Sequence, residues 1–285
     1  MTLGGTGIWA GDLRYGPEEE IPEAAAELES LGYTAAWIPD VGGDVFGALA
    51  RLLDATSTMT VATGILNVWM HEAADTAAFY AGRSPSDQDR LLLGLGVSHG
   101  ALIGDKWVKP LEVMTTYLDA LDAAGLAVSA RCLAALGPRM LALAARRSAG
   151  AHPYLGTPEH TATARQLLGP TALLAPEQGV VLEADPAVAR DIARHALGTY
   201  AGLPNYTNNW KRVGFDDHDV ATLSDRLVDR LVAWGDLDAI AARVQEHRQA
   251  GADHVCVQVL TGTGNALAAG SLPRSEWRRL APALT

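Results

Sequence analysis

The chain of 285 residues is 48% hydrophobic and 19% charged, a composition that can bury a large core and is unlike that of a disordered chain. Its formal charge of −11, without any run of lysine and arginine longer than a pair, argues against a nucleic-acid-binding surface. The start lacks a signal-peptide pattern, no apolar run is long enough to span a bilayer, and the only cysteines, Cys132 and Cys256, lie far apart, so we expect a soluble cytoplasmic protein without disulfides.

Short β-like runs alternate with helical patterns along the chain, which is the order of parallel strands joined by crossover helices. The predicted strands span residues 6–10, 34–39, 60–66, 90–97, 130–136, 152–155, 178–183 and 254–260. The predicted helices span residues 18–31, 45–53, 72–81, 110–122, 138–148 and 275–280, with two more that begin at Thr157-Pro158 and Asp185-Pro186. Eight strands and eight helices in this length predict an α/β fold, a (β/α)8 TIM barrel.

The competing fold is an open, doubly wound sheet, which typically carries a G-x-G-x-x-G motif after its first strand. The near matches that start at Gly94 and Gly262 have His99 and Leu267 in place of the third glycine, so the barrel is favoured. Residues 204–234, which overlap the polar and aromatic stretch LPNYTNNWKRVGF, exceed what a barrel needs between strands 7 and 8. We predict one domain over residues 1–285 with residues 204–234 as an insertion, which either shapes the pocket or forms extra surface helices.

The predicted fourth strand lies in LLLGLGVSHG, residues 91–100, and contains Gly94 and Gly96. A glycine inside a strand often marks a place where another group approaches the backbone closely. We therefore expect another group to approach the backbone of this strand closely.

The active site of a (β/α)8 barrel lies at the carboxyl ends of its strands. The side chains expected there are those of Trp9, Asp40, Asn67, Ser98, His99, Gly137, His152, Tyr154, Gln258 and Thr261. Asp40 either contacts a cofactor or caps the next helix, and His152 either takes part in chemistry or is a hydrogen-bonded wall residue. His99 is either a proton donor and acceptor or a polar loop residue.

Motifs for metal or serine chemistry are absent from the sequence. His71 precedes Glu72 without H-E-x-x-H spacing, no H-x-H pair occurs, and Ser98 does not lie in a G-x-S-x-G elbow. We predict no metal site, and we interpret His71 as a helix-start residue.

Several stretches, in consistent order over nearly the whole chain, carry a family resemblance. The chain resembles the bacterial luciferase-like superfamily and, within it, the actinobacterial branch of coenzyme F420-dependent (deazaflavin) oxidoreductases. The matching stretches are ELESLGYTAAWIPD, TVATGILNVW, RLLLGLGVSHGALIG, KPLEVMTTYLDALDAAG, LAALGPRMLALAA, GAHPYLGTPEHTATARQLLGP, LLAPEQGVVLEADPAVAR and LPNYTNNWKRVGF.

The resemblance implies that a flat tricyclic ring lies in the barrel mouth, backed by a bulge with a cis peptide bond at Gly64-Ile65, and that the cofactor phosphate meets a helix N-terminus. The cofactor-binding residues that it implies are Asp40, Gly64, Ile65, Asn67, Val97, Ser98, Leu136, Gly137, Pro138 and Arg139. For catalysis it favours His99, with Asp40 and His152 as second choices. Val41 and His99 replace a histidine and a glutamate of the sugar-phosphate dehydrogenases, which argues against oxidation of glucose 6-phosphate.

The function implied is hydride transfer between coenzyme F420 and a small organic substrate. One alternative is an FMN-dependent monooxygenase of the same superfamily, and another is a non-catalytic barrel that binds a ligand. The superfamily commonly forms dimers, so we expect a homodimer.

Overall fold

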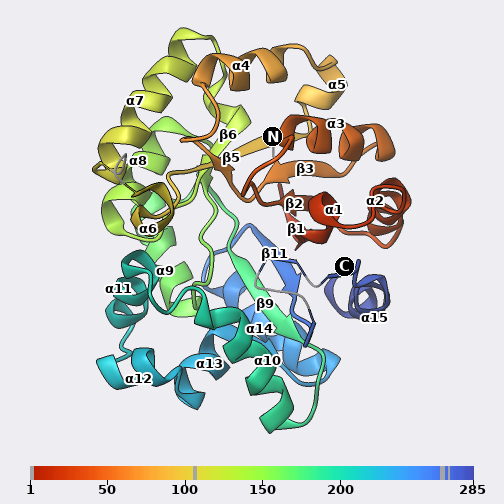
Figure 1. Cartoon of the computed structure of the whole chain (residues 1–285), viewed down its shortest axis with the longest axis vertical. Helices are drawn as coiled ribbons and strands as arrows, with labels where there is room; N and C mark the ends of the chain where they lie inside the picture. The colour runs from red at the N-terminus through yellow and green to blue at the C-terminus, as the bar shows by residue number, and fades with distance from the viewer. Residues whose placement is uncertain (1–2, 105–107, 264–266, 269) are drawn as a thin grey trace.

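The strands form one curled parallel sheet with helices packed around it, the barrel that the sequence predicts (Figure 1). The computed structural model describes residues 3–104, 108–263, 267–268 and 270–285. Every strand pair in these ranges is parallel. The strands are β1 (Gly5–Trp9), β2 (Ala35–Ile38), β3 (Thr60–Thr63), β4 (Leu66–Asn67), β5 (Leu91–Gly96), β6 (Arg131–Leu133), β7 (Gly150–Ala151), β8 (Leu173–Leu174), β9 (Glu177–Val181), β10 (Val232–Trp234) and β11 (His254–Val259).

The helices begin largely where the sequence predicts, because the capping residues act as expected. Thr157 accepts a hydrogen bond from the backbone N–H of His160, and Asp185 accepts from those of Ala187 and Val188. No described helix has both the length and the apolar character needed to cross a membrane. The α-helices are α1 (Asp12–Tyr15), α2 (Ile21–Ser30), α3 (Val45–Ala55), α4 (Ala73–Ala81), α5 (Pro85–Gln88), α6 (Gly100–Ile103), α7 (Pro110–Ala123), α8 (Pro138–Arg147), α9 (Pro158–Leu168), α10 (Pro186–Gly198), α11 (Pro204–Arg212), α12 (Asp217–Thr222), α13 (Asp225–Leu231), α14 (Leu237–Gln249) and α15 (Arg274–Leu284).

The extended segment 173–181 closes the sheet into a barrel. Its first part, β8, pairs with β7, and its second part, β9, pairs with β11. Between these pairings the backbone N–H groups of Ala175 and Glu177 donate to the carbonyls of Ala151 and Pro153. Because β11 also pairs with β1, the ladder returns to its first strand.

One sequence expectation for this half of the chain was wrong. The sixth strand is residues 150–151 rather than 152–155, because the backbone turns after Ala151 and Leu155 adopts a left-handed conformation with φ of 52°. Residues 204–234 form α11, α12 and α13 and end in β10, a strand that pairs with β9. The division into one domain with an insertion stays a prediction.

Apolar side chains fill the inside of the barrel as well as the layer between strands and helices. The interior cluster includes Trp9, Trp37 and Leu92 together with both cysteines, Cys132 and Cys256, which are free thiols. Burial raises the pKa of the Cys132 thiol to about 12 and that of Cys256 well above its ordinary value. Both cysteines are therefore packing residues and not nucleophiles.

The last helix, α15, packs against α2 near the start of the chain (Figure 1). Arg274 pairs with Glu23 and Glu27, Arg278 also pairs with Glu27, and the Tyr33 hydroxyl donates to the Trp277 carbonyl. These contacts join the first and last parts of the described chain on the outside of the barrel.

The glycines of β5 are explained by close neighbours, as the sequence predicts. A β carbon at Gly94 would lie 2.0 Å from the carbonyl oxygen of Thr63, and one at Gly96 would lie 2.5 Å from the Ile65 side chain. Neither position has a positive φ, so the close neighbour, and not the backbone conformation, accounts for the glycine. The atom that a β carbon at Gly94 would meet belongs to the backbone, which cannot easily move. The atoms that a β carbon at Gly96 would meet belong to a side chain, which can adopt another rotamer.

We predict that Gly94→Ala lowers the free energy of unfolding by about 3 kcal/mol and Gly96→Ala by about 1 kcal/mol, because only the first change forces the backbone of β3 to move. Urea denaturation of the purified variants measures both values. The matched control is Gly198→Ala in α10, where a β carbon meets no atom within 4 Å and stability should rise slightly. Equal losses at the two β5 positions would contradict this explanation.

Candidate functional site

A cavity of about 830 Å³ opens at the carboxyl ends of the barrel strands. This volume lies in the range of small-molecule and cofactor pockets. Most residues predicted for the site come together here. Pro138 and Arg139 are exposed and do not line the cavity, and Gln258 and Thr261 line a smaller hollow instead. The predicted residues that line it are Asp40, Gly64, Ile65, Asn67, Val97, Ser98, His99, Leu136, Gly137 and His152.

Asp40, just after β2, is held by three partners from other parts of the chain. Its carboxylate lies 3.1 Å from the Arg14 guanidinium and 2.7 Å from His71 Nε2, and it accepts the backbone N–H of Asn67. Asp40 does not cap α3, because the N-cap is Asp44. The helix-cap alternative is therefore wrong, and His71, interpreted above as a helix-start residue, is a partner of Asp40 as well.

The segment between β3 and β4 forms the floor of the cavity. The Gly64–Ile65 peptide bond is cis, as the resemblance implied. Trp9 Nε1 donates to the Gly64 carbonyl at 2.8 Å, and the Ile65 side chain packs on Gly96. With glycine at both 64 and 96, the floor carries little side-chain bulk beyond that of Ile65.

The end of β5 places Val97, Ser98 and His99 on the cavity wall. Ser98 has a φ of 57°, which is uncommon for a residue with a side chain and recurs at functional sites. Burial lowers the pKa of His99, and a hydrogen bond with the Asn205 side chain partly opposes this shift. His99 is therefore neutral at pH 7 and can accept a proton.

Helix α8 begins at the cavity, with Gly137 as its N-cap and no side chain capping it. The N–H groups at a helix start attract anions, although Pro138 at the first position has none and that of Met140 donates to the Gly137 carbonyl. A β carbon on Gly137 would lie 3.7 Å from Arg212 Nη2, so the start of α8 has a cation beside it. Sequence reasoning missed Arg212, and the only signal for it is its place in the stretch LPNYTNNWKRVGF.

His152 lies below the cavity, directly after β7, and is only 1% exposed. Its ring stacks on Trp37 with centroids 4.3 Å apart, and its Nδ1 lies 2.8 Å from the Ala175 carbonyl oxygen. That carbonyl can only accept, so Nδ1 carries the proton and Nε2 is a bare acceptor. Burial lowers the pKa of His152 to about 4, so the ring stays neutral and is a poor proton acceptor near pH 7.

Three tyrosines complete the cavity on the side of β7 and α10. Tyr154 follows His152, while Tyr200 and Tyr206 come from the segment after α10 and from α11. The sequence indicated Tyr154 by its place at the end of a predicted strand, whereas Tyr206 was not singled out, although it lies in the polar and aromatic stretch LPNYTNNWKRVGF. Tyr200 lies just beyond a helix and carried no such signal.

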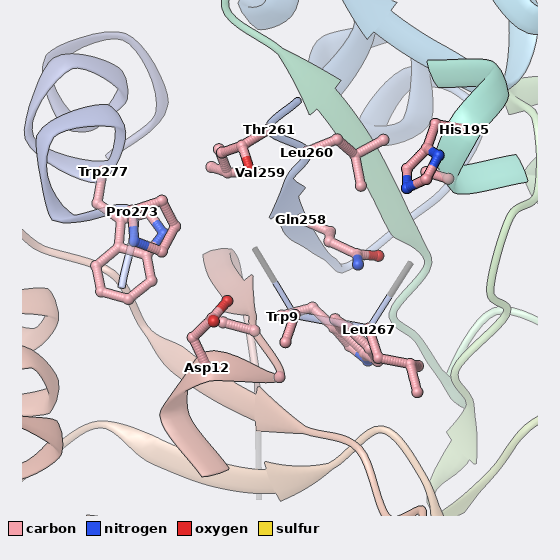
Figure 2. Close-up of a pocket in the computed structure, with 14 residues that line it drawn as sticks. Trp9, Asp12, His195, Gln258, Val259, Leu260, Thr261, Leu267, Pro273 and Trp277 are labelled. Carbon is pink, nitrogen blue, oxygen red and sulfur yellow. The ribbon is translucent and has the colours of Figure 1, made fainter. Parts of the chain in front are cut away.

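A second hollow lies at the ends of β1 and β11, beside the segment that precedes α15 (Figure 2). Its volume of about 10 Å³ holds no more than one water. Trp9 and Leu267 line both this hollow and the larger cavity, and Leu267 lies close to Trp9 in Figure 2. This hollow is too small for a ligand.

Residues 5–125 match the model of the luciferase-like monooxygenase family. An F420-dependent secondary alcohol dehydrogenase, solved with an F420–acetone adduct, has a TM-score of 0.74 at 13% identity over 99% of both chains. The coenzyme F420-dependent tetrahydromethanopterin reductase of Methanopyrus kandleri has 0.74 at 17% over 99% of both. The oxygenating constituent of a Pseudomonas putida diketocamphane monooxygenase, solved with FMN, has 0.68 at 13% over 99% of both. At these identities the likeness to the three structures shows the fold.

Glu177 of β9 fixes the turn that carries His152 and Tyr154. Its Oε2 accepts the backbone N–H of Leu155 at 3.0 Å, while its Oε1 has no partner among the described residues. Burial raises the pKa of this carboxyl from 4.5 to about 8. Glu177 is therefore mostly protonated at pH 7 in the folded protein and ionised when the chain unfolds.

We predict that Glu177→Gln stabilises the protein relative to the wild type as the pH rises. Between pH 4.5 and 8 the folded wild type holds a proton that the unfolded chain has lost, so its stability falls over this window and is level above it. The amide keeps the bond to Leu155 without titrating. Urea denaturation should show a gain for the variant, on the order of 4 kcal/mol, that develops between pH 5 and 8; a gain independent of pH would contradict the assignment.

Proposed function

We propose that this protein, a luciferase-like chain by the match of residues 5–125 and by its barrel, is an oxidoreductase that uses coenzyme F420 to transfer a hydride to or from a small organic substrate. The observation that carries the proposal is the gathering of the predicted cofactor residues along one side of a single cavity. A cavity of about 830 Å³ has room for a tricyclic ring and a substrate beside it.

The residues present fit a deazaflavin or flavin cofactor. Gly64 and Gly96 add no side chains to the floor, so the side chain of Ile65 is the bulk that a flat ring meets there. The start of α8 and Arg212 offer N–H groups and a positive charge to a phosphate. These features support a phosphate-bearing ring cofactor and do not distinguish F420 from FMN.

When bound, a deazaflavin supplies or accepts a hydride. Leu136 and Gly137, with Arg212 beside them, would hold the phosphate, and Ser98 and Val97 would border the ring. Asp40, fixed by Arg14 and His71, would orient the ring edge. His99 would hold or release the proton at its imidazole nitrogen, since it is neutral near pH 7 and borders the same cavity.

Cofactor choice is tested by titrating the purified protein separately with F420 and with FMN and following the quenching of cofactor fluorescence. We expect F420 to bind at least tenfold more tightly than FMN. Tighter binding of FMN would favour the monooxygenase alternative, which the FMN-bound barrel among the similar structures makes the second candidate. Binding of neither would support a non-catalytic barrel.

The proton role of His99 is tested by His99→Ala. We expect turnover to fall about 100-fold, the range of general acid–base catalysis, with little change in cofactor affinity. The control is His218→Ala in α12, an exposed histidine outside the cavity lining, which should behave as the wild type. Unchanged turnover in the His99 variant would exclude this role.

A further inference from the structure

One wall of the cavity has no assigned partner once the cofactor residues are placed. The assigned residues follow β2, β3, β5 and β6, whereas the wall formed by Trp9, His152, Tyr154, Tyr200 and Tyr206 lies at β1, after β7 and after α10. We call these five residues the aromatic wall. If the cofactor ring lies along the side formed by the assigned residues, the aromatic wall is left for the substrate.

The tyrosine rings of the aromatic wall form one cluster. The centroids of Tyr154 and Tyr200 are 5.5 Å apart, those of Tyr200 and Tyr206 are 5.0 Å apart, and Trp9 lies 5.3 Å from Tyr154. Edge and tilted contacts of this kind hold the rings in place. The wall is therefore a preformed apolar surface that suits a flat or cyclic molecule.

The hydroxyl protons of two tyrosines are already used. Tyr154 donates to Gln258 Oε1 at 2.8 Å, an oxygen that can only accept. The contact of 3.3 Å between the Tyr154 and Tyr200 hydroxyls then has Tyr200 as its donor. Tyr200 is left with acceptor capacity for a ligand.

His152 Nε2 is a buried acceptor in the wall that lacks a partner among the described residues. It is unprotonated and can therefore accept a hydrogen bond, but it is buried and receives none from a described residue. It lies next to the cavity floor, since a β carbon on Gly64 would come within 3.0 Å of it. A buried acceptor without a partner costs free energy, which a donor on a ligand recovers.

The aromatic wall presents no ionised side chain near pH 7. Burial raises the pKa of each tyrosine and lowers that of His152 to about 4. Glu177, behind the wall, has its pKa raised to about 8 by the same burial. A carboxylate or phosphate on the ligand would therefore lose its hydration here without gaining a cation.

We propose that the aromatic wall binds the substrate, and that the substrate is an uncharged cyclic or aromatic compound whose hydroxyl group donates a hydrogen bond to His152 Nε2. His152 acts as a specificity-determining residue and not as the proton carrier. This proposal rests on the proposed function, because that function assigns the other side of the cavity to the cofactor. The preference for an uncharged ligand with a hydroxyl group depends only on the residues of the aromatic wall.

Three naphthalene probes test this preference at pH 7, in protein without cofactor and in protein saturated with whichever of F420 or FMN binds. They are 2-naphthol, which is neutral and has a donor, 2-methoxynaphthalene, which lacks the donor, and 2-naphthoate, which is an anion. We expect 2-naphthol to bind about tenfold more tightly than either of the others, the value of one hydrogen bond to a buried acceptor. Equal binding of naphthol and its methyl ether, or tighter binding of naphthoate, overturns the proposal.

The role of His152 is tested by His152→Phe and by nitrogen-15 NMR of the wild type. The variant should bind 2-naphthol as weakly as 2-methoxynaphthalene, with the ether unaffected. In the wild type, 2-naphthol should shift the His152 Nε2 resonance and the ether should not, a readout that needs no variant to fold. An unmoved resonance with naphthol bound overturns the assignment.

The two proposals fail in different ways. If a cofactor binds and none of the three probes does, the aromatic wall is not a substrate site, and the proposed function stands. If the probes rank as expected and neither F420 nor FMN binds, the proposed function fails, and the wall remains a ligand site.

Discussion

The structure depends on one extended segment, residues 173–181, which bonds to β7 through its first part and to β11 through its second. Without it the curled sheet would be open, and its strand ends would not face one cavity. The same segment builds part of the site: the Ala175 carbonyl fixes the proton of His152, and Glu177 fixes the backbone of Leu155. Closure of the barrel and preorganisation of the turn after β7 thus depend on the same segment.

The two sides of the cavity differ in how their polar groups are satisfied. On the side of β2, the Asp40 carboxylate has protein partners for both oxygens, so a ligand meets a network already in place. On the side of β7, His152 Nε2 has none among the described residues. The first side suits a cofactor held in one orientation, and the second suits a reactant that binds and leaves.

Much of the fold was predictable because its determinants are local. Caps such as Thr157 and Asp185 fix helix starts, and the glycines of β5 report close neighbours. The ends of the strands then indicated His99, His152 and Tyr154. Long-range contacts were not predictable: nothing near Arg14 or His71 in the sequence indicates Asp40 as their partner, and Tyr200 reaches the cavity only through the course of the chain after α10.

The reactivity of the two buried thiols can report the opening of the barrel. Cys132 and Cys256 lie among the side chains that fill the interior, on strands at different positions around the sheet. An alkylating reagent reaches neither while the ladder is intact, because both thiols are out of contact with solvent and poorly ionised. The rates at which the two thiols are alkylated therefore depend on how often the surrounding strands separate. A difference between the two rates shows whether the strands around Cys132 or those around Cys256 separate first.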